Sequence, residues 1–251
     1  MQNLSIPLTR LLALLVLVFQ TALAADSKRP PTIVLISGEY EYESAQTLPA
    51  FKQHLETHYG FNCIYLERTK GEDIPGLTAL EKADLVVVLI RRMTLPEEQL
   101  DRFKKYLDSG KPLIGLRTAS HAFENWKDFD REVLGGNYHN HYGNDLVATI
   151  KVRAEAADHP ILKGVANEFG SGGSLYLNAP LPDSSTVLLT GSVMNQPPEP
   201  VAWIHSYKGA RVFYTSLGHP KDFENSSFKR LLVNAIFWTL GRPAPDAPVP
   251  R

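Results

Sequence analysis

The sequence has little of what would place it in several common classes of protein. It holds one cysteine, Cys63, so no intramolecular disulfide can form. Its 26 lysine and arginine residues are balanced by 27 aspartate and glutamate residues, with no dense basic block. A nucleic-acid partner is therefore not expected. The apolar run Leu11–Phe19 is too short to span a bilayer, so no stable membrane span is expected either.

The N-terminal stretch has the pattern of a cleavable signal peptide. Arg10 precedes the apolar run, and Ala22-Leu23-Ala24 is the small-x-small pattern that a signal peptidase cuts. We expect residues 1–24 to be removed, which makes the mature protein periplasmic or secreted, with residues 25–31 as a flexible leader. The alternative is a membrane anchor, which the shortness of the apolar run disfavours. No cysteine lies near the cut, so a lipid anchor is not expected.

Hydrophobic runs and amphipathic stretches alternate along the chain, as they do in βαβ units of a parallel sheet. The sequence predicts an α/β domain over residues 32–242 with a three-layer, flavodoxin-like architecture and a mostly parallel sheet. A proline-rich tail, residues 243–251, follows as a loose segment. Strands are expected at 32–37, 61–66, 84–90, 112–116, 145–152, 186–190, 201–204 and 211–216, and helices at 44–59, 77–82, 95–108 and 226–240.

Three local features refine this picture. Ser44 is expected to cap the helix over 44–59. Thr94 and Glu97 have the spacing of a capping box for the next long helix. Cys63 lies in a predicted strand, where a buried and unreactive thiol is a better interpretation than a nucleophile.

Polar residues gather where four of the predicted strands end. In open α/β sheets, the carboxyl ends of parallel strands are where ligands bind, so these residues are expected to meet at one edge. The four clusters are Gly38-Glu39-Tyr40, Arg91-Arg92, Arg117 to His121, and Gly218-His219.

Arg117 is the most informative of these residues. It stands where the strand-to-turn elbow of a hydrolase would place a nucleophile. An arginine stays charged and cannot attack a substrate or carry a proton, but its N–H groups can hold a carboxylate, a phosphate or a sugar oxygen. The alternative is an internal ion pair with Glu39 or Asp222. We favour contact with a ligand.

Ser120 and His121 suggest a nucleophile–base pair, but neighbours in sequence rarely face each other in hydrogen-bonding geometry. A base would have to come from elsewhere in the fold, and His219 is the candidate. Ser120 is more simply interpreted as a helix N-cap.

Histidine is the residue type that could hold a metal ion in this chain. His121, His139, His141 and His219 could together bind a divalent ion. No dense pattern of acidic residues and histidines accompanies them, so neither a metal nor an organic cofactor is expected. The helical pair His54 and His58 is interpreted as solvated.

With these residues in view, the chain resembles the trehalose-utilisation (ThuA-like) family, whose fold is similar to that of class I glutamine amidotransferases. The resemblance runs from about residue 32 to residue 241 and implies a role in the catabolism of disaccharides and oxidised sugars, with a small carbohydrate as ligand. The segments that carry it are Gly115–Phe123 (GLRTASHAF), Leu134–His139 (LGGNYH), His159–Gly164 (HPILKG), Pro200–Trp203 (PVAW) and Gly209–His219 (GARVFYTSLGH) with Phe223.

The chain departs from these patterns at two places. Amidotransferases have a catalytic cysteine where this chain has Arg117, so thioester chemistry is excluded and the protein is not a glutamine amidotransferase. Many ThuA-like proteins have an Asp-Glu pair before a Leu-Tyr, whereas Gly173 and Ser174 precede Leu175-Tyr176 here.

The expected protein is an exported enzyme, a hydrolase or isomerase, that acts on a small sugar, disaccharide or keto-sugar. His121 or His219 would be the general acid or base. Substrate contacts are expected from Glu39, Tyr40, Arg92, Arg117, Ser120 and His139, while Tyr138 and Trp203 could stack on a sugar or, for Trp203, lie in the core. The alternative is a non-catalytic sugar-binding or sensing module derived from the same fold.

Overall fold

The structure is a computed structural model that describes residues 29–246. The predicted signal peptide, residues 1–24, lies outside the described residues, as do residues 25–28 of the predicted leader and 247–251 of the predicted tail. The chain from Thr32 onward forms one compact unit. Among the described residues, no helix has the length and apolarity needed to cross a bilayer.

A nine-stranded sheet in the order β2-β1-β3-β4-β11-β10-β9-β6-β7 forms the centre of this unit. The first five strands in this order run parallel, as predicted, and the other four continue the sheet in antiparallel fashion. The strands are β1 (Thr32–Gly38), β2 (Asn62–Glu67), β3 (Leu85–Ile90), β4 (Leu113–Leu116), β6 (Ala148–Val152), β7 (Glu168–Ser171), β9 (Thr186–Ser192), β10 (Glu199–Tyr207) and β11 (Ala210–Thr215). A separate pair joins β5 (Asn140–His141) to β8 (Tyr176–Leu177).

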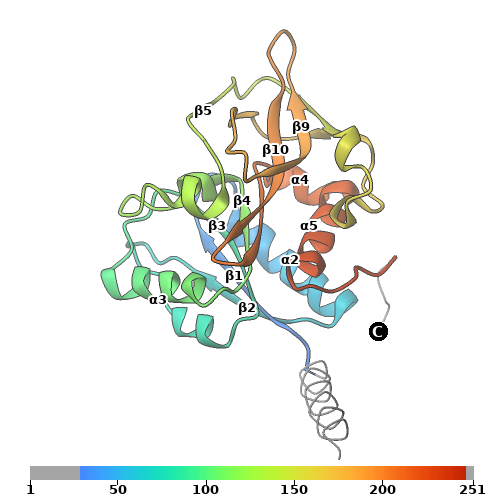
Figure 1. The fold of residues 1–251 in the computed structure, drawn as a ribbon. Helices are drawn as coiled ribbons and strands as arrows, with labels where there is room; N and C mark the ends of the chain where they lie inside the picture. The colour runs from blue at the N-terminus through green and yellow to red at the C-terminus, as the bar shows by residue number, and fades with distance from the viewer. Residues whose placement is uncertain (1–28, 247–251) are drawn as a thin grey trace, which may run out of the picture. The chain divides into compact units, whose positions relative to one another are not determined.

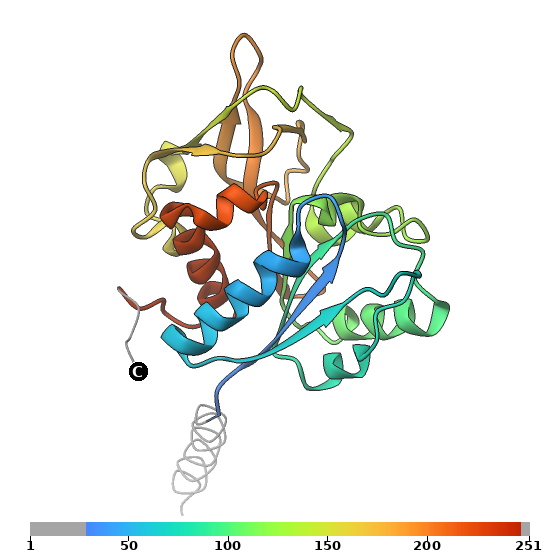
Figure 2. The ribbon, with the colours of Figure 1, turned by 180° about the vertical axis from the view of Figure 1, so that it is seen from behind.

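Helices cover both faces of the sheet, which gives the predicted three layers (Figures 1 and 2). α2 (Ser44–Tyr59) and α5 (Ser226–Thr239) lie on one face, and α3 (Glu97–Asp108) lies on the other with the short helix η2 (Leu77–Lys82). The remaining helical segments are η3 (Arg117–His121), η4 (Asp130–Leu134), η5 (Ala154–Ala156), η6 (Pro160–Leu162) and α4 (Pro220–Glu224).

The alternating direction of side chains along a strand produces two hydrophobic cores. Ile33 and Leu35 of β1 pack in the core under α2 and α5, whereas Val34 and Ile36 pack in the core under α3. A strand buried on both faces must be apolar at every position, which is why the parallel strands read as continuous hydrophobic runs. Cys63 of β2 is buried as predicted, and burial raises the pKa of its thiol to about 12.

The predicted helix caps were wrong, although the helices were placed correctly. The Ser44 hydroxyl bonds the Ser37 hydroxyl at 2.6 Å instead of capping α2. The buried carboxylate of Glu39 does the capping, because it accepts the amides of Tyr42 at 2.6 Å and Ser44 at 2.8 Å. α3 follows Pro96, and no side chain caps it.

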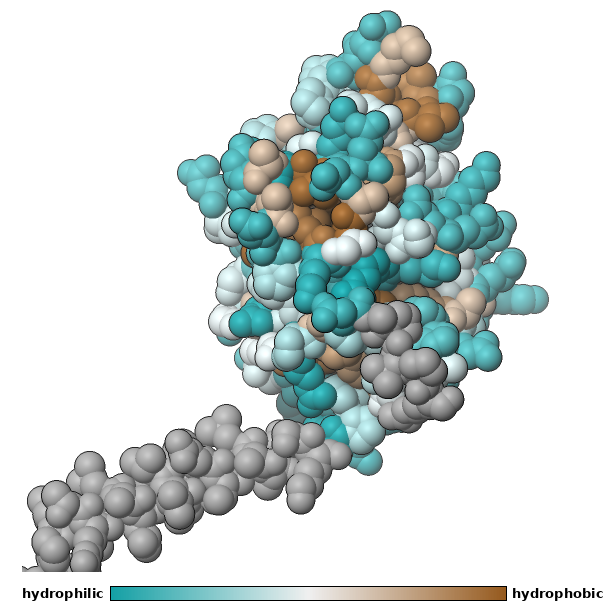
Figure 3. Space-filling model, turned by 90° about the vertical axis from the view of Figure 1, so that its right-hand side faces the viewer, coloured by the Kyte–Doolittle hydropathy of each residue, from teal (hydrophilic) through white to brown (hydrophobic). Residues whose placement is uncertain are grey.

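Exposed apolar side chains are few in the described part of the chain. Figure 3 shows hydrophilic and apolar groups interspersed on the side that carries α4 and α5, with an apolar patch near the tip of the β9–β10 hairpin. Met194 at this tip is 79 % exposed, and Val147, just before β6, is 77 % exposed.

Replacing Gly115 by alanine is expected to destabilise the protein. A Cβ at this position of β4 would lie 2.9 Å from Leu134 Cδ2 and 3.0 Å from Tyr214 Cδ2, inside the core under α3. Overpacking of this kind costs about 1–3 kcal/mol of unfolding free energy, measurable by urea denaturation. Gly170→Ala in β7 is the matched control, since its Cβ would meet no atom within 4 Å and its stability should change by less than about 0.5 kcal/mol. Equal stabilities of the two variants would contradict this packing.

Candidate functional site

The four polar clusters predicted from the sequence follow strands that are neighbours in the sheet. β1, β3, β4 and β11 lie side by side and run parallel, so their carboxyl ends meet at one edge. The segments that leave this edge are the β1–α2 turn, the turn after β3, the short helix η3, and the turn into α4.

Arg117 lies at the centre of this edge. It is the first residue after β4 and has a φ of 42°, the left-handed backbone that a sharp elbow between strand and helix requires. Its side chain is 1 % exposed and lies between two aromatic rings, with the guanidinium carbon 4.1 Å from the Tyr42 ring centroid and 4.8 Å from that of Tyr176. Nη1 donates to the Ser216 carbonyl at 2.9 Å and Nη2 to the Ser174 hydroxyl at 3.2 Å.

The charge of Arg117 is not neutralised by a carboxylate in contact with it. Glu39 is committed to the amides of the β1–α2 turn, and Asp222 accepts the amides of Gly172, Gly218 and His219. The alternative of an internal ion pair was therefore wrong. The Nε atom of Arg117 is buried without a hydrogen-bond partner in the described residues. The site thus holds a buried cation whose contacts are all neutral.

His121, at the end of η3, packs directly beside this centre. Its ring stacks on Tyr138 with centroids 4.6 Å apart and an interplanar angle of 22°. Burial, together with the positive charges of Arg91, Arg92 and Arg117, lowers the pKa of His121 to about 3. The imidazole is consequently neutral at physiological pH, and it can donate or accept a hydrogen bond but does not carry a positive charge.

Ser120 and His121 do face each other, contrary to the sequence-based expectation. The Ser120 hydroxyl lies 3.1 Å from His121 Nδ1 and 3.3 Å from the Arg117 carbonyl. Both residues belong to the 3-10 helix η3. Ser120 lies inside η3, so its interpretation as an N-cap was also wrong.

His219 lies beside Tyr42, with the two ring centroids 6.0 Å apart. It caps α4, because its Nδ1 accepts the amide of Lys221 at 3.2 Å, while Asp222 accepts the His219 amide in return. The neutral ring therefore carries its proton on Nε2. Burial lowers the pKa of His219, against the opposing effect of Asp222.

The other predicted substrate contacts differ in their distance from this centre. Arg92 has a φ of 46°, and its amide donates to the His121 carbonyl at 2.8 Å. Tyr40 is 65 % exposed and donates its hydroxyl to the Thr69 carbonyl at 2.7 Å. His139 is exposed, and its Nδ1 lies 3.0 Å from the Asn137 carbonyl. The structure gives neither Tyr40 nor His139 a contact with Arg117 or His121.

Sequence reasoning missed three residues of this region, namely Tyr42, Tyr176 and Asp130. Tyr42 stood two residues beyond a predicted cluster, and Tyr176 belongs to a two-residue strand that no hydrophobic pattern reveals. Trp203 lies in the core, completely buried, with its indole N–H donating to the Leu134 carbonyl at 2.7 Å. It is not available for stacking on a sugar.

No metal centre is formed in the part of the chain that the structure describes, where no three or more His, Cys, Asp or Glu side chains are grouped to hold an ion. His54 and His58 on α2 have ring centroids 4.8 Å apart, without a third ligand beside them.

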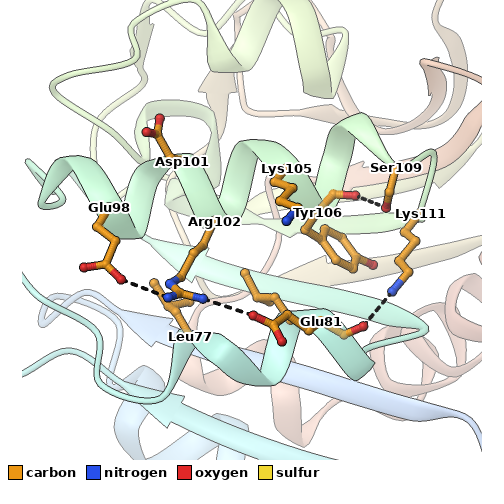
Figure 4. Close-up of a pocket in the computed structure, with 10 residues that line it drawn as sticks. Leu77, Glu81, Glu98, Asp101, Arg102, Lys105, Tyr106, Ser109 and Lys111 are labelled. Atoms are coloured by element: carbon orange, nitrogen blue, oxygen red, sulfur yellow. Dashed lines mark hydrogen bonds and ion pairs between the residues drawn. The ribbon is translucent and has the colours of Figure 1, made fainter.

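Two cavities lie near the α3 side of the sheet. One of about 240 Å³ is bordered by Ser120, His121, Asp130 and Tyr138 and adjoins the Arg117 centre. Another, of about 630 Å³, lies between α3 and η2 (Figure 4). Its charged groups bind one another: Arg102 pairs with Glu81 at 3.0 Å and with Glu98 at 2.8 Å. This larger cavity therefore offers few free polar groups to a ligand.

Residues 32–239 match the model of the ThuA family, which is described as trehalose utilisation. The chain belongs to the ThuA family. This membership supports a carbohydrate-related role. No curated protein matches the chain.

Solved structures with the same fold include two ThuA-like proteins. One, from Bacteroides uniformis, is 22 % identical over 84 % of this chain and 92 % of that one, with a TM-score of 0.65. The other, from Parabacteroides merdae, is 20 % identical over 88 % and 95 %, with a TM-score of 0.68. A β-galactosidase from Bacillus circulans matches 85 % of this chain with 32 % of its own length, at 12 % identity and a TM-score of 0.59. At these identities the likeness shows the fold alone.

His121 is expected to remain neutral when the solution is acidified. In the unfolded chain a histidine titrates near pH 6.5, whereas the folded pKa is about 3, so protonation below pH 6.5 favours the unfolded state. The stability that depends on the neutral ring is present above pH 6.5 and is lost as the pH falls toward 3. His121→Gln should therefore lose less stability than the wild type between pH 7 and pH 4.5.

NMR of the imidazole resonances over the same range provides the direct measurement, with the variant used to assign the His121 signal. A His121 resonance that titrates between pH 6 and pH 7 would contradict the predicted neutrality.

Proposed function

We propose that this ThuA-family protein is exported and that it binds a small sugar, disaccharide or keto-sugar, on which it acts by acid–base chemistry without a covalent nucleophile. Membership of the ThuA family supports a carbohydrate ligand, and the geometry of the site supports the acid–base chemistry. The observation that carries the proposal is the buried Arg117 guanidinium at the elbow, held by neutral partners and two tyrosine rings.

A cation in this position stabilises negative charge on an oxygen. Arg117 has no contacting carboxylate, and Arg92 adds its charge from the turn after β3, where Arg91 is paired with Glu41 at 2.8 Å. In a buried site such preorganised charge strongly stabilises an oxyanion or enediolate that develops during reaction. The carbonyl of a keto-sugar and the hydroxyls beside it are groups of this kind.

The two histidines would have different parts in this chemistry. His121 is neutral, so it would polarise a sugar oxygen through a hydrogen bond instead of giving up a proton as an imidazolium ion. His219 is less deeply buried than His121, and Nδ1 is held by the Lys221 amide, which leaves Nε2 as the atom that can exchange a proton. Glu39 would act indirectly, since its carboxylate shapes the turn that carries Tyr42.

A binding or sensing module remains the second candidate. The observation that favours it is the absence of any nucleophile at the elbow, where Arg117 can bind but cannot attack. Titration calorimetry with a sugar, followed by mass analysis of the same mixture, separates the two functions. Heat of binding with product formed supports an enzyme, and binding with unchanged sugar supports a module.

Replacement of either histidine should reduce turnover of keto-disaccharides. A positioned acid or base contributes about 100- to 10 000-fold to the rate, and a hydrogen-bond donor to a developing oxyanion about 100- to 1 000-fold, so His219→Ala and His121→Ala should each lower kcat by at least about 100-fold. His58→Ala is the control, because His58 lies on α2 and contacts His54 rather than the site. Undiminished turnover in both site variants would exclude histidine catalysis.

Export is tested with the full sequence in a Gram-negative host. The periplasmic fraction should contain a protein whose N-terminal residue is Ala25, and a chain without residues 1–24 should stay in the cytoplasm. Intact protein in the membrane fraction would instead indicate an anchor and contradict cleavage.

A further inference from the structure

The cavity of about 240 Å³ beside His121 differs from the other cavities in what surrounds it. Its border combines aromatic faces with polar groups that come from three consecutive segments of the chain. The aromatic contributors include Trp126 and Tyr138, and the polar ones include Ser120, Asn137 and Asp130. Ligand sites are mainly apolar with a few placed polar groups, and this volume lies below the range of about 300–1,000 Å³ for drug-sized ligands. A cavity of this volume has room for one small ring of a ligand.

A series of packed aromatic rings lies between the cavity and Arg117. His121 stacks on Tyr138 at 4.6 Å, and Tyr138 in turn lies 4.6 Å from Tyr176, whose ring faces Arg117. Tyr138 thus borders the cavity on one side and the aromatic cluster around Arg117 on the other. The face of a sugar ring is apolar and packs on aromatic faces, while its hydroxyls need polar partners at the edge.

Tyr138 forms one wall of the cavity, and Asp130 lies behind Tyr138 and holds it in place. Its Oδ2 accepts the Tyr138 amide at 2.8 Å, and its backbone carbonyl accepts the Gly136 amide at 2.9 Å. Gly136 packs against the carboxyl so closely that a Cβ at this position would collide with Oδ1. Oδ1 itself is buried without a hydrogen-bond partner in the described residues. Nothing in the proposed chemistry accounts for this carboxyl group.

We propose that the cavity beside His121 is a subsite for one ring of an uncharged disaccharide, and that Asp130 is the positioning residue that sets its Tyr138 wall. The proposal rests on the proposed carbohydrate function and adds to it the place where one sugar ring binds.

The position of the Tyr138 wall depends on Asp130 being uncharged. Burial raises the pKa of Asp130 to about 7, against the opposing effect of the Tyr138 amide. Above that pH the carboxylate has one amide to stabilise it and an oxygen without a partner, which is costly in the interior. The groups that face it are Tyr214 from β11, Tyr138 and His121 from the cavity wall, and the charged Glu124, Lys127 and Arg131 at the rim.

The first experiment tests contact with the ring. Trehalose and glucose are titrated calorimetrically at pH 6 into the wild type, Trp126→Leu and Trp238→Leu. Trp126 borders the subsite, whereas Trp238 is a half-buried tryptophan on α5 that packs near His159. We expect the wild type to bind both sugars, because each offers one uncharged ring to the subsite. Trp126→Leu should lower the affinity for trehalose at least about tenfold, while Trp238→Leu should change that affinity less than about twofold.

The second experiment tests the role of Asp130. Its folded pKa is raised, so the protonated state prevails below pH 7 and is lost as the pH rises through 7. Wild-type affinity for trehalose should fall at least about tenfold from pH 6 to pH 8.5. Asp130→Asn keeps an uncharged amide in the same place, so it should bind at pH 8.5 as the wild type does at pH 6. Asp101→Asn, in the cavity between α3 and η2, should keep the wild-type pH profile.

The outcomes separate the two proposals. Binding of trehalose that neither Trp126→Leu nor a change of pH affects would overturn the subsite and leave the carbohydrate function standing. A wild type that binds neither sugar would overturn the subsite as well as the assignment of these sugars. A pH profile shared by the wild type and Asp130→Asn would remove Asp130 from the positioning role.

Discussion

The packing of the Arg117 guanidinium between the rings of Tyr42 and Tyr176 is the interaction on which the site depends. These three residues come from the turn after β1, the elbow after β4 and the short strand β8, so a single contact joins three distant parts of the chain. Arginine tolerates such burial because its charge is delocalised and weakly hydrated, and because aromatic faces attract it. The hydrogen bonds to Ser216 and Ser174 fix the plane of the guanidinium.

The electrostatic state of the site follows from this arrangement. A cation without a contacting carboxylate raises the potential around it, and the neighbouring His121 responds with a pKa far below its ordinary value. Asp130 lies behind Tyr138, on which His121 stacks, and burial raises its pKa. Two titratable groups on one cavity wall are thus both held neutral near pH 6, which suits a ligand rich in hydroxyls and without charge.

The parallel half of the fold could be predicted from the sequence because its physical signal is local. A strand buried on both faces has to be apolar throughout, and α2 has the regular spacing of an amphipathic helix. The antiparallel half was harder to predict. The strands predicted at 186–190 and 201–204 lie within β9 and β10, but their direction depends on pairing with β6 and β11, which no local pattern encodes. Caps failed for a similar reason, since Glu39 caps α2 from outside the helix.

The candidate site could likewise be predicted only where its residues have a local signal in the sequence. Arg117, His121 and His219 could be found because each lies in the segment that follows a strand, and the topology places these strand ends at one edge. Tyr176 could not, because it reaches the site through a two-residue strand that shows no hydrophobic periodicity. Asp130 looked like an ordinary residue of a polar segment, and its burial results from the return of the chain at Gly136 and Tyr138. Residues placed by tertiary contacts alone leave no trace in hydrophobic periodicity.

Gly173 leaves the elbow little freedom to change during evolution. A methyl group here would lie 2.5 Å from Arg117 Nη1, so a larger residue at 173 is compatible only with a smaller one at 117. The reverse also holds, because a cysteine at 117 would leave an unfilled hole beneath Gly173 and between two tyrosine rings. A lineage that moves between a guanidinium with glycine at 173 and a thiol with a larger residue there must therefore make two coupled substitutions, each of which taken alone destabilises the packing around the elbow.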